Sequence, residues 1–324
     1  RTLIKHVLES DQIGGRVKVA GWVRTRRDSK GGFSFLELND GSSFAGVQIV
    51  VPGEIENYES EILNVTIGSA VAVTGELVES PGSGQRVEIH AGNVHVYGYA
   101  DPDDYPLQKK RIGFERLREI AHLRPRTNTF GAMARVRNAL AYATHRFYQE
   151  RDFLYLHTPM ITASDAEGAG EMFQVTTLDV GAPPRVGDAV DYSQDFFGRP
   201  TFLTVSGQLE AESYALALDR VYTFGPTFRA ENSNTRRHLA EFWMIEPEVA
   251  FADLSDNADL AEAYVRYLFQ YILDHCSTDL EFFNKWVDDG LLARLDSIAS
   301  ADFRRITYTE AVEVLSKAEV AFDY

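Results

Sequence analysis

The segment from Phe224 to Phe242 carries side chains of the types that bind a nucleotide. Arg229 and Glu231 lie two positions apart, and such residues point to the same face of a β-strand. A guanidinium holds a phosphate through two hydrogen bonds, and a carboxylate can accept one from the amino group of adenine. In the turn, Arg236, Arg237 and His238 are candidates for binding the triphosphate tail. Phe242 on the returning segment is a candidate for stacking on the base. The pattern suits ATP, although a surface ion pair beside a solvated loop has the same spacing.

The elements that position these side chains follow from hydrophobic periodicity. Strands over 221–229 and 242–251 are expected to flank a polar loop as a hairpin. Upstream, a long helix is predicted from about residue 130 to 150, followed by a short strand over 153–156 that Pro159 stops. Ser255 is expected to cap a later helix. The apolar helix faces are Met133, Val136, Leu140, Ala143 and Phe147, and Leu260, Tyr264, Leu268 and Ile272. A mixed α+β domain is therefore expected.

The first hundred residues follow a different pattern. From Arg16 to about Tyr99 apolar residues alternate with a period of two, between turns rich in glycine, asparagine and serine. About five short strands favour an OB-fold barrel, and another small barrel fits the same pattern. We thus expect an α+β multidomain chain, with an N-terminal OB-fold β-barrel at 1–100, a hinge at 101–127 and a second domain at 128–324. The stretch from Val180 to Arg199 is expected to be a surface insertion.

Composition limits the classes of function. The 324 residues are 44% hydrophobic and 25% charged, as in soluble globular proteins. With 32 basic and 48 acidic side chains the net charge is −16, which argues against indiscriminate polyanion binding but allows a local basic patch. The single cysteine, Cys276, excludes an internal disulfide and a structural zinc site built on thiols. The sequence has no apolar run near the ~20 residues of a membrane span, so a cytoplasmic protein is expected.

The hairpin segment resembles motif 2 of the class II aminoacyl-tRNA synthetases. The runs Phe228 to Ser233 and Arg237 to Met244 look like the asparaginyl-tRNA synthetase family in particular. Further similar runs extend over nearly the whole chain, at Gly21 to Asp28, Ala121 to Asn128 and Val205 to Leu209. The resemblance implies an anticodon-reading OB-fold and a catalytic domain built on an antiparallel sheet. It also implies a ligase that uses ATP and Mg²⁺ to form asparaginyl-adenylate and then charges the asparagine-accepting tRNA.

The resemblance assigns roles to individual residues around the nucleotide and the amino acid. Arg229 would be catalytic, because it would hold the α-phosphate and stabilise the charge that develops as the carboxylate attacks. The other ATP contacts implied are Glu231 for the adenine amino group, Phe242 for stacking on adenine, and Arg237 and His238 for the outgoing phosphates. The segment around Glu167 matches a loop that is mobile in the family, and Glu167 and Gln208 match residues that face the α-amino group of the amino acid. A loop acid and a capping amide are the simpler interpretations of these two.

The choice between asparagine and aspartate depends on the residues after Gln208. Related aspartyl enzymes place a lysine three residues later, where its charge can pair with the substrate carboxylate, and this chain has Ala211 there. Glu212 follows, one helical turn after Gln208. A glutamate accepts from a side-chain amide but repels a carboxylate, so the site favours asparagine. A helix-surface acid is the alternative interpretation of Glu212.

In the barrel, the resemblance implies that an anticodon base stacks on Phe35, that Gln48 reads the central uridine and that Glu88 contacts a purine edge. Arg27, with Arg24 and Arg26, would form a cationic cluster for phosphates. Phe35 is otherwise a core residue, and the arginines a solvated face. Arg124 and Arg126 at the hinge are further candidates for tRNA contacts.

The resemblance has two consequences for assembly and completeness. The helix at 130–150 and the strand after it resemble motif 1, which implies a homodimer, with packing inside one monomer as the alternative. Motif 3, Gly-x-Gly-x-x-Arg, and the acidic Mg²⁺ ligands before it have no counterpart before Tyr324, so the catalytic domain is expected to be incomplete at its C-terminus. No metal ligand is identified in this chain. The alternatives are a catalytically incomplete tRNA-binding fragment, an aspartate-accepting relative and an asparagine-making ligase.

Overall fold

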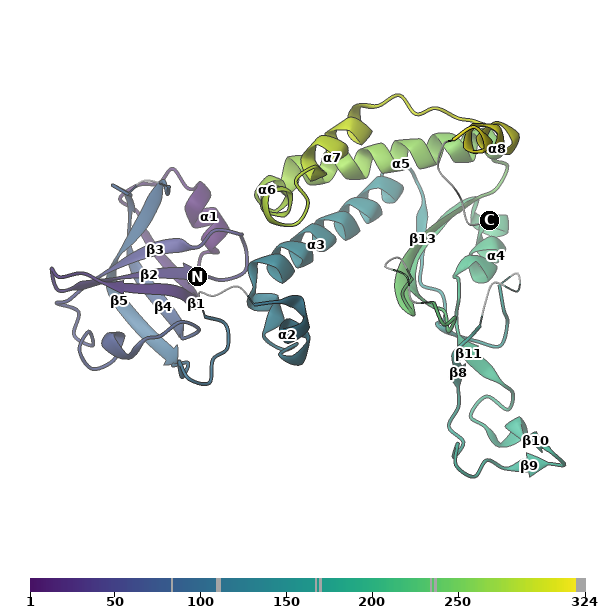
Figure 1. Cartoon of the computed structure of the whole chain (residues 1–324), viewed down its shortest axis with the longest axis horizontal. Helices are drawn as coiled ribbons and strands as arrows, with labels where there is room; N and C mark the ends of the chain where they lie inside the picture. Colours follow the sequence, from purple (N-terminus) through teal and green to yellow (C-terminus); the bar gives the residue numbers. More distant parts are fainter. Residues whose placement is uncertain are drawn as a thin grey trace. The chain divides into compact units, whose positions relative to one another are not determined.

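The computed structural model describes residues 1–318 except 83, 109–111, 167, 169–170, 234 and 236–237. The chain forms two compact units. The first contains Arg1–Asn138 and His275–Leu292, and the second contains Ala139–Asp274 and the described residues from Ala293 onward (Figure 1). The boundaries predicted from the sequence, at residues 100 and 127, stay a prediction.

The first unit is built on a closed β-barrel with the strand order β1-β2-β3-β5-β4. Its strands are β1 (Arg16–Asp28), β2 (Phe33–Asn39), β3 (Val47–Pro52), β4 (Ala70–Glu79) and β5 (Val87–Gly98). Neighbouring strands are antiparallel except β3 and β5, which are parallel. Alternate residues such as Leu36, Ile49 and Ile89 are fully buried, so the predicted period of two and the five-stranded barrel are confirmed.

Short helices complete the first unit: α1 (Ile4–Glu9), η1 (Ile62–Asn64), α2 (Phe114–Glu119), η2 (Arg124–Arg126), the start of α3 (Asn128–Gln149), and α6 (Ser277–Trp286). Arg135 on α3 makes an ion pair with Asp279 on α6, with 2.6 Å between Nη2 and Oδ1. The same guanidinium donates to the carbonyl of Gly41 in the β2–β3 turn, at 3.2 Å. This bonding fixes α3 and α6 to the barrel.

The second unit holds two three-stranded sheets, β13-β12-β6 and β7-β11-β8. Their strands are β6 (Leu154–Leu156), β7 (Ile161–Thr162), β8 (Gln174–Val175), β11 (Thr201–Leu203), β12 (Arg220–Phe228) and β13 (Glu241–Val249). β12 pairs antiparallel with β13 and parallel with β6. The helices are the part of α3 from Ala139 onward, α4 (Gln208–Leu218), α5 (Leu254–His275), α7 (Leu291–Ser300) and α8 (Tyr308–Ser316). An aromatic core of Phe147, Tyr148, Phe153 and Tyr222 packs against Leu260 and Tyr264.

Three local expectations are corrected by the structure. The strand expected to reach Arg229 ends at Phe228, so Arg229 and Glu231 lie beyond β12 and do not share a strand face. Helix α5 begins at Leu254, and the carboxylate that caps it belongs to Asp253, whose Oδ1 accepts from the backbone N–H of Ser255 at 2.7 Å. Ser255 is therefore inside the helix. Met133 is 48% exposed and does not join the buried face of α3.

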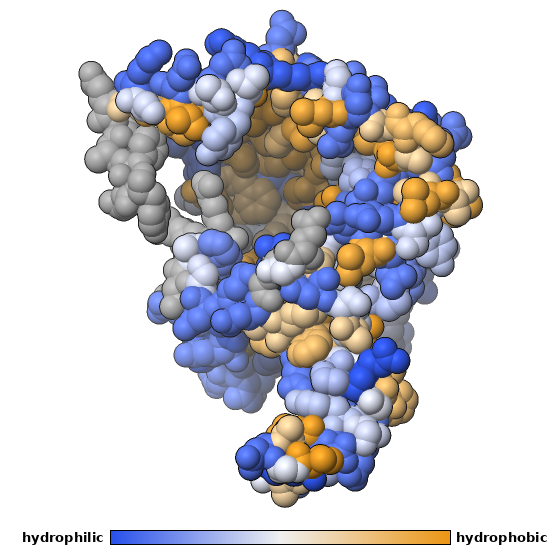
Figure 2. Space-filling model, turned by 90° about the vertical axis from the view of Figure 1, so that its right-hand side faces the viewer, coloured by the Kyte–Doolittle hydropathy of each residue, from blue (hydrophilic) through white to orange (hydrophobic). Residues whose placement is uncertain are grey.

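The stretch predicted as a surface insertion forms a small hairpin, β9 (Arg185–Val186) and β10 (Ala189–Val190), followed by η3 (Tyr192–Gln194). Figure 1 shows the hairpin at the far end of the segment between β8 and β11. Apolar side chains are exposed on it, including Val180 at 85% and Phe196 at 77%, and Figure 2 shows the resulting apolar colour at the lower end of the molecule.

Asp195 holds the base of this insertion. Its carboxylate accepts hydrogen bonds from the Thr176 hydroxyl at 2.6 Å and from the backbone N–H of Thr177 and Phe196 at 2.9 and 2.7 Å. These bonds, with that from Thr176 the strongest, lower the pKa of Asp195 to about 2. Because the folded-state pKa is depressed, the stabilisation is present above the usual pKa of an aspartate and is lost as the pH falls through about 2.

We expect Asp195→Asn to open the insertion while leaving the barrel unchanged. The NH₂ group of asparagine would face the hydroxyl and backbone N–H groups that now donate to the carboxylate. Limited proteolysis and hydrogen exchange at pH 7 should show faster cleavage and exchange over residues 176–200. Asp188→Asn is the matched control, because Asp188 is exposed on the same hairpin. Equal protection in Asp195→Asn and Asp188→Asn would contradict the assignment.

Candidate functional site

The β12–β13 hairpin positions the residues expected to bind the nucleotide. Thr227 pairs with Phe242 and Phe228 with Glu241 at the open end of the hairpin. Arg229 follows directly, and its backbone N–H donates to the carbonyl of Ala240 at 3.0 Å. This bond continues the hairpin by one residue and brings Arg229 beside Phe242.

The guanidinium of Arg229 has unused hydrogen-bonding capacity. Its Cζ lies 5.6 Å from the centre of the Phe242 ring. Its Nε is buried and has no hydrogen-bond partner within the described residues. A buried N–H without an acceptor is costly, and a phosphate oxygen is the acceptor that matches a guanidinium best. The arrangement therefore fits an anionic group bound by the Arg229 guanidinium, beside the ring of Phe242.

The other predicted nucleotide contacts lie in the loop between the two strands. Glu231 is exposed, and its carbonyl accepts from the backbone N–H of Ser233 at 2.9 Å. His238 is exposed, and its Nδ1 lies 3.1 Å from the hydroxyl of Ser233. Arg236, Arg237 and Glu167 lie outside the described residues.

At the amino-acid end, Gln208 and Glu212 lie on one face of α4. The Gln208 Nε2 donates to Glu212 Oε1 at 2.9 Å, as the spacing of one helical turn predicts. Ala211, which lies between them in the sequence, is fully buried. Burial raises the pKa of Glu248, as do the nearby charges of Glu212 and Glu246. Glu212 therefore belongs to a group of carboxylates on α4 and β13.

Sequence reasoning missed Glu246. This residue pairs with Thr223 across the hairpin, and its Oε2 accepts from the Thr223 hydroxyl at 2.8 Å and from the backbone N–H of Gly207 at 3.1 Å. The Ser206 hydroxyl donates to its other oxygen. The available signal was a glutamate in the middle of a strand, where an unpaired charge is disfavoured. Glu246 fixes the start of α4, and thus Gln208, against β12.

A cavity of about 90 Å³ lies beside this carboxylate. Its lining includes His157, Thr204, Gly207, Phe224 and Glu246. A Cβ on Gly207 would lie 2.9 Å from the Thr158 Oγ1, so the close approach of α4 to the strands requires glycine there. The cavity adjoins the carboxylate that orients α4, and none of the site residues predicted from the sequence lines it.

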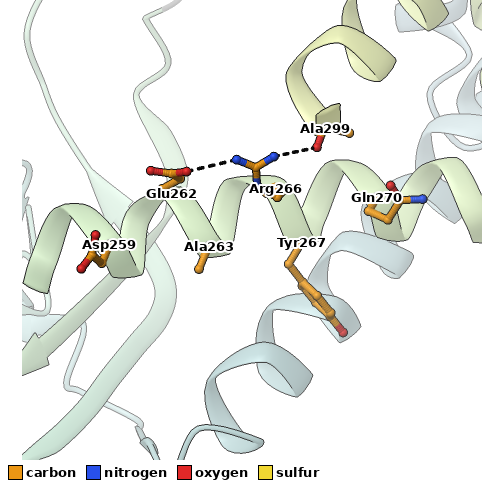
Figure 3. A pocket seen from close by; sticks show the side chains of 7 residues that line it. All are labelled: Asp259, Glu262, Ala263, Arg266, Tyr267, Gln270 and Ala299. Carbon is orange, nitrogen blue, oxygen red and sulfur yellow. Dashed lines mark hydrogen bonds and ion pairs between the residues drawn. The ribbon is translucent and has the colours of Figure 1, made fainter. Parts of the chain in front are cut away.

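A larger, open cavity of about 560 Å³ lies on α5 (Figure 3). Arg266 bonds along α5 to Glu262, at 3.0 Å, and to the carbonyl of Ala299 on α7, at 3.2 Å. Arg305 also contacts Glu262, at 3.2 Å. These contacts are internal ion pairs and hydrogen bonds, and none of the residues predicted to bind substrate lines the cavity.

On the barrel, the structure brings together all four residues predicted to contact the anticodon. Arg27 and Phe35 are paired across β1 and β2, with the guanidinium 5.3 Å from the ring centre. The Arg27 Nη2 donates to Gln48 Oε1 at 3.1 Å, and the Gln48 Nε2 donates to Glu88 Oε2 at 2.9 Å. A cation, an aromatic ring and polar edges thus form one continuous patch on the outside of the barrel.

Two of the three arginines expected to form a phosphate-holding cluster have internal partners instead. Arg24 donates to the carbonyl of Arg126 and, at 2.9 Å, to the Asn128 side chain. Arg26 donates to the carbonyl of Val65 at 3.0 Å and makes an ion pair with Asp28 at 2.9 Å. Only Arg27 of the three faces the patch.

The hinge arginines also lie against aromatic rings of the first unit. Arg124 lies 5.0 Å from the ring centre of Phe130, and Arg126 lies 5.1 Å from that of Trp22. Within the described residues, no group of three histidine, cysteine, aspartate or glutamate side chains could hold a metal ion. No helix among them is long and apolar enough to cross a membrane.

Family models cover both parts of the chain. Residues 115–323 match the class II tRNA synthetases (D, K and N). Residues 17–97 match the OB-fold nucleic acid binding domain. Because the second match covers the closed barrel, the OB-fold prediction is confirmed, and so is that of a class II synthetase domain after it.

Curated relatives are similar along the whole chain. The asparagine--tRNA ligase of Thermosynechococcus vestitus is 55% identical over 322 residues, which cover 99% of this chain and 70% of the relative. That of Shewanella sediminis is 59% identical over 96% of this chain and 67% of the relative. Among solved structures, asparaginyl-tRNA synthetase from Pyrococcus horikoshii complexed with asparaginyl-adenylate gives a TM-score of 0.80 at 26% identity, covering 99% of this chain and 68% of that one.

The identity, the family models and the shared fold agree with the resemblance in the sequence. The chain spans about 70% of the length of the first relatives. The chain belongs to the asparaginyl-tRNA synthetases, within the class II (D, K and N) family.

Proposed function

We propose that this chain attaches asparagine to its tRNA in two steps, using ATP. Asparagine is first activated as asparaginyl-adenylate, and the asparaginyl group is then transferred to the terminal ribose of tRNA. The observation that carries the proposal is the position of Arg229 at the end of the β12–β13 hairpin. Its guanidinium lies beside the ring of Phe242, and its buried Nε has no partner among the described residues. Identity of 55–59% to asparagine--tRNA ligases supports it.

In this proposal Arg229 acts electrostatically on the α-phosphate. The carboxylate of asparagine attacks the phosphorus while pyrophosphate leaves, so negative charge builds on the phosphoryl oxygens. The guanidinium holds these oxygens, and its own position is fixed by the backbone bond to Ala240. Phe242 stacks on adenine, Glu231 accepts from the adenine amino group, and His238 and Arg237 contact the outgoing phosphates.

Selection of asparagine is assigned to α4. Gln208 contacts the α-amino group, as the family resemblance also implies for Glu167, and Glu212 accepts a hydrogen bond from the side-chain amide of asparagine. A carboxylate substrate would meet Glu212 near Glu246 and Glu248, a region where burial and like charges already raise the pKa of Glu248. Aspartate is therefore repelled, while a neutral amide is accepted.

Glu212→Gln is expected to weaken this discrimination, because glutamine removes the negative charge that repels aspartate. The ratio of kcat/KM for asparagine to that for aspartate should fall about tenfold. Removing the repulsion between two exposed charges is worth ~1 kcal/mol, and the glutamine amide can also donate a hydrogen bond to the aspartate carboxylate. Glu210→Gln is the matched control, since Glu210 is exposed in the first turn of the same helix. An unchanged ratio in Glu212→Gln would remove Glu212 from the specificity site.

The barrel is proposed to read the anticodon with Arg27, Phe35 and Gln48, the last of which is held by Glu88. One base stacks on Phe35 beside the Arg27 guanidinium, a combination that binds single-stranded RNA in OB-folds. Gln48 presents its amide edge to the central base. Single-stranded bases are commonly read by such stacking and edge bonds.

Three further features are proposed from the family rather than from contacts in this chain. Mg²⁺ would accompany ATP, but the described residues contain no group of ligands for it, so no step here passes through the metal. A homodimer would form through the region of α3 and β6. The cytoplasmic location stays a prediction.

The proposed function is tested by charging the asparagine-accepting tRNA with labelled amino acid. We expect asparaginyl-tRNA to form in the presence of ATP, with at least a hundredfold preference for asparagine over aspartate. Charging with aspartate at a comparable rate would support an aspartate-accepting relative. Stable tRNA binding without charging would support the tRNA-binding fragment instead.

A further inference from the structure

Next to the barrel patch lies His90, to which the resemblance in the sequence assigns no role. Strand pairing places Arg27 opposite Phe35, Phe35 opposite Val50 and Val50 opposite His90. The four residues therefore form one row across β1, β2, β3 and β5, on the outer face. Phe35 and His90 are separated by two strand spacings, ~10 Å, so neighbouring nucleotides of a splayed loop can address both.

Glu88, in the adjacent row, is already saturated by protein donors. It is only 3% exposed. Its carboxylate receives hydrogen bonds from Gln48 Nε2 at 2.9 Å, Ser80 Oγ at 2.8 Å, Gln85 Nε2 at 3.3 Å and His90 Nε2 at 3.1 Å. A buried carboxylate with four donors has little surface left for a base. Its geometry is that of an anchor which orients Gln48 and His90.

His90 is the exposed member of this pair. Its side chain is 53% accessible, against 4% for that of Glu88. An ionised carboxylate only accepts hydrogen bonds, so the Nε2 of His90 carries the hydrogen that points to Glu88. In the neutral ring, Nδ1 is then an acceptor, and it has no hydrogen-bond partner in the described part of the chain.

The backbone also fixes where His90 points. The β4–β5 pairing shifts register between Thr74 and Gly75, and such bulges re-aim the side chains around them. A Cβ at Gly75 would lie 2.2 Å from the carbonyl of His90, so the close approach of the two strands requires glycine there. The backbone of His90 is thus held close to β4, and its imidazole is bonded to Glu88.

We propose that His90 reads a second anticodon base, accepting through Nδ1 a hydrogen bond from an N–H on that base while its neighbour stacks on Phe35. The proposal rests on the anticodon-reading role of the barrel given above. It assigns Glu88 to positioning and His90 to the contact with RNA. The base recognised carries an imino or amino N–H on its Watson–Crick edge.

The test measures equilibrium binding of this chain to a labelled anticodon stem-loop of the asparagine-accepting tRNA. Three further stem-loops each lack the base at one anticodon position. With the intact stem-loop, His90→Ala should weaken binding roughly fivefold, the equivalent of one hydrogen bond of ~1 kcal/mol. For one of the three abasic stem-loops, His90→Ala should cause no further loss of affinity, because the base that His90 contacts is already missing. That anticodon position should be next to the one whose contribution is lost in Phe35→Ala.

Side-chain replacements separate the hydrogen bond from structure. His90→Gln keeps a donor for Glu88 and an acceptor for the base, so it should recover most of the affinity, whereas His90→Leu should not. His95→Ala, at an exposed histidine of the same strand, should bind like the parent chain.

Two results would overturn the assignment of His90. One is parent-like binding by His90→Ala, and the other is an equal loss with all three abasic stem-loops. A parent chain that does not bind the stem-loop at all would overturn both this proposal and the anticodon role of the barrel. Failure of the proposal alone is therefore distinguishable from failure of the proposed function.

Discussion

Arg229→Ala is expected to reduce asparagine-dependent ATP–pyrophosphate exchange roughly 10³-fold or more, the usual effect of removing an arginine that stabilises phosphoryl charge. The physical reason is that the Arg229 guanidinium, with a buried Nε that has no partner within the described residues, is the group proposed to meet the α-phosphate. Arg229→Lys keeps a charge but loses the two-pronged geometry, so it should recover only a small part of the rate.

The control for this variant is Arg220→Ala, at the other end of β12. Arg220 is half-exposed and lies 3.9 Å from Asp219. It should exchange at the parent rate. Affinity for tRNA should change less than about twofold in Arg229→Ala, because the barrel is untouched. Equal losses of exchange and of tRNA affinity would point to misfolding and would contradict a role confined to the phosphate.

Arg135→Ala is expected to lower the free energy of unfolding of the first unit by about 3–5 kcal/mol, the range for breaking a buried ion pair by removing one partner. The substitution leaves the Asp279 carboxylate, which is 6% exposed, without its cation. It also removes the bond to the carbonyl of Gly41. Chemical denaturation followed by a probe in the barrel measures the change.

Two further variants sharpen this result. Arg137→Ala changes an exposed arginine of the same helix and should leave stability within about 0.5 kcal/mol of the parent. Arg135→Ala combined with Asp279→Ala should cost less than the sum of the single changes, because no charge is left buried and unpaired. A loss below about 1 kcal/mol in Arg135→Ala would show that the pair does not hold α3 and α6 to the barrel.

The barrel and the hairpin follow from sequence because their signals are local. Alternation of apolar residues such as Leu36 and Leu38 sets which side of a strand enters the core. The end of β12 was less predictable, because Arg229 continues the hairpin by one backbone bond and then leaves the strand. That exit depends on the loop as a whole.

Long-range partners were the main source of error in the site. The run Arg24, Arg26 and Arg27 looks like one cationic cluster, but carbonyls of Val65 and Arg126 take two of the three guanidinium groups. These partners lie 39 and 102 residues away, which no periodicity reveals. Family resemblance did identify Gln48 and Glu88, whose contact links β3 to β5.

The roles of buried carboxylates were also invisible in the sequence. Glu246 resembles any acid on a strand, and only the fold places it against Gly207 and Thr223. Glu88 was expected to contact a base, and only the structure shows that Ser80 and Gln85 already donate to its carboxylate. In both cases burial, rather than residue type, determines what the carboxylate can do.

Amino-acid-dependent ATP–pyrophosphate exchange on this chain tests the central claim most directly, because it isolates adenylate formation from tRNA. The account predicts exchange with asparagine and none above background with aspartate at equal concentration. Exchange with aspartate at a similar rate would contradict the specificity assigned to Glu212. No exchange with either amino acid, in a sample that still binds the anticodon stem-loop, would contradict the ligase activity and leave a tRNA-binding chain.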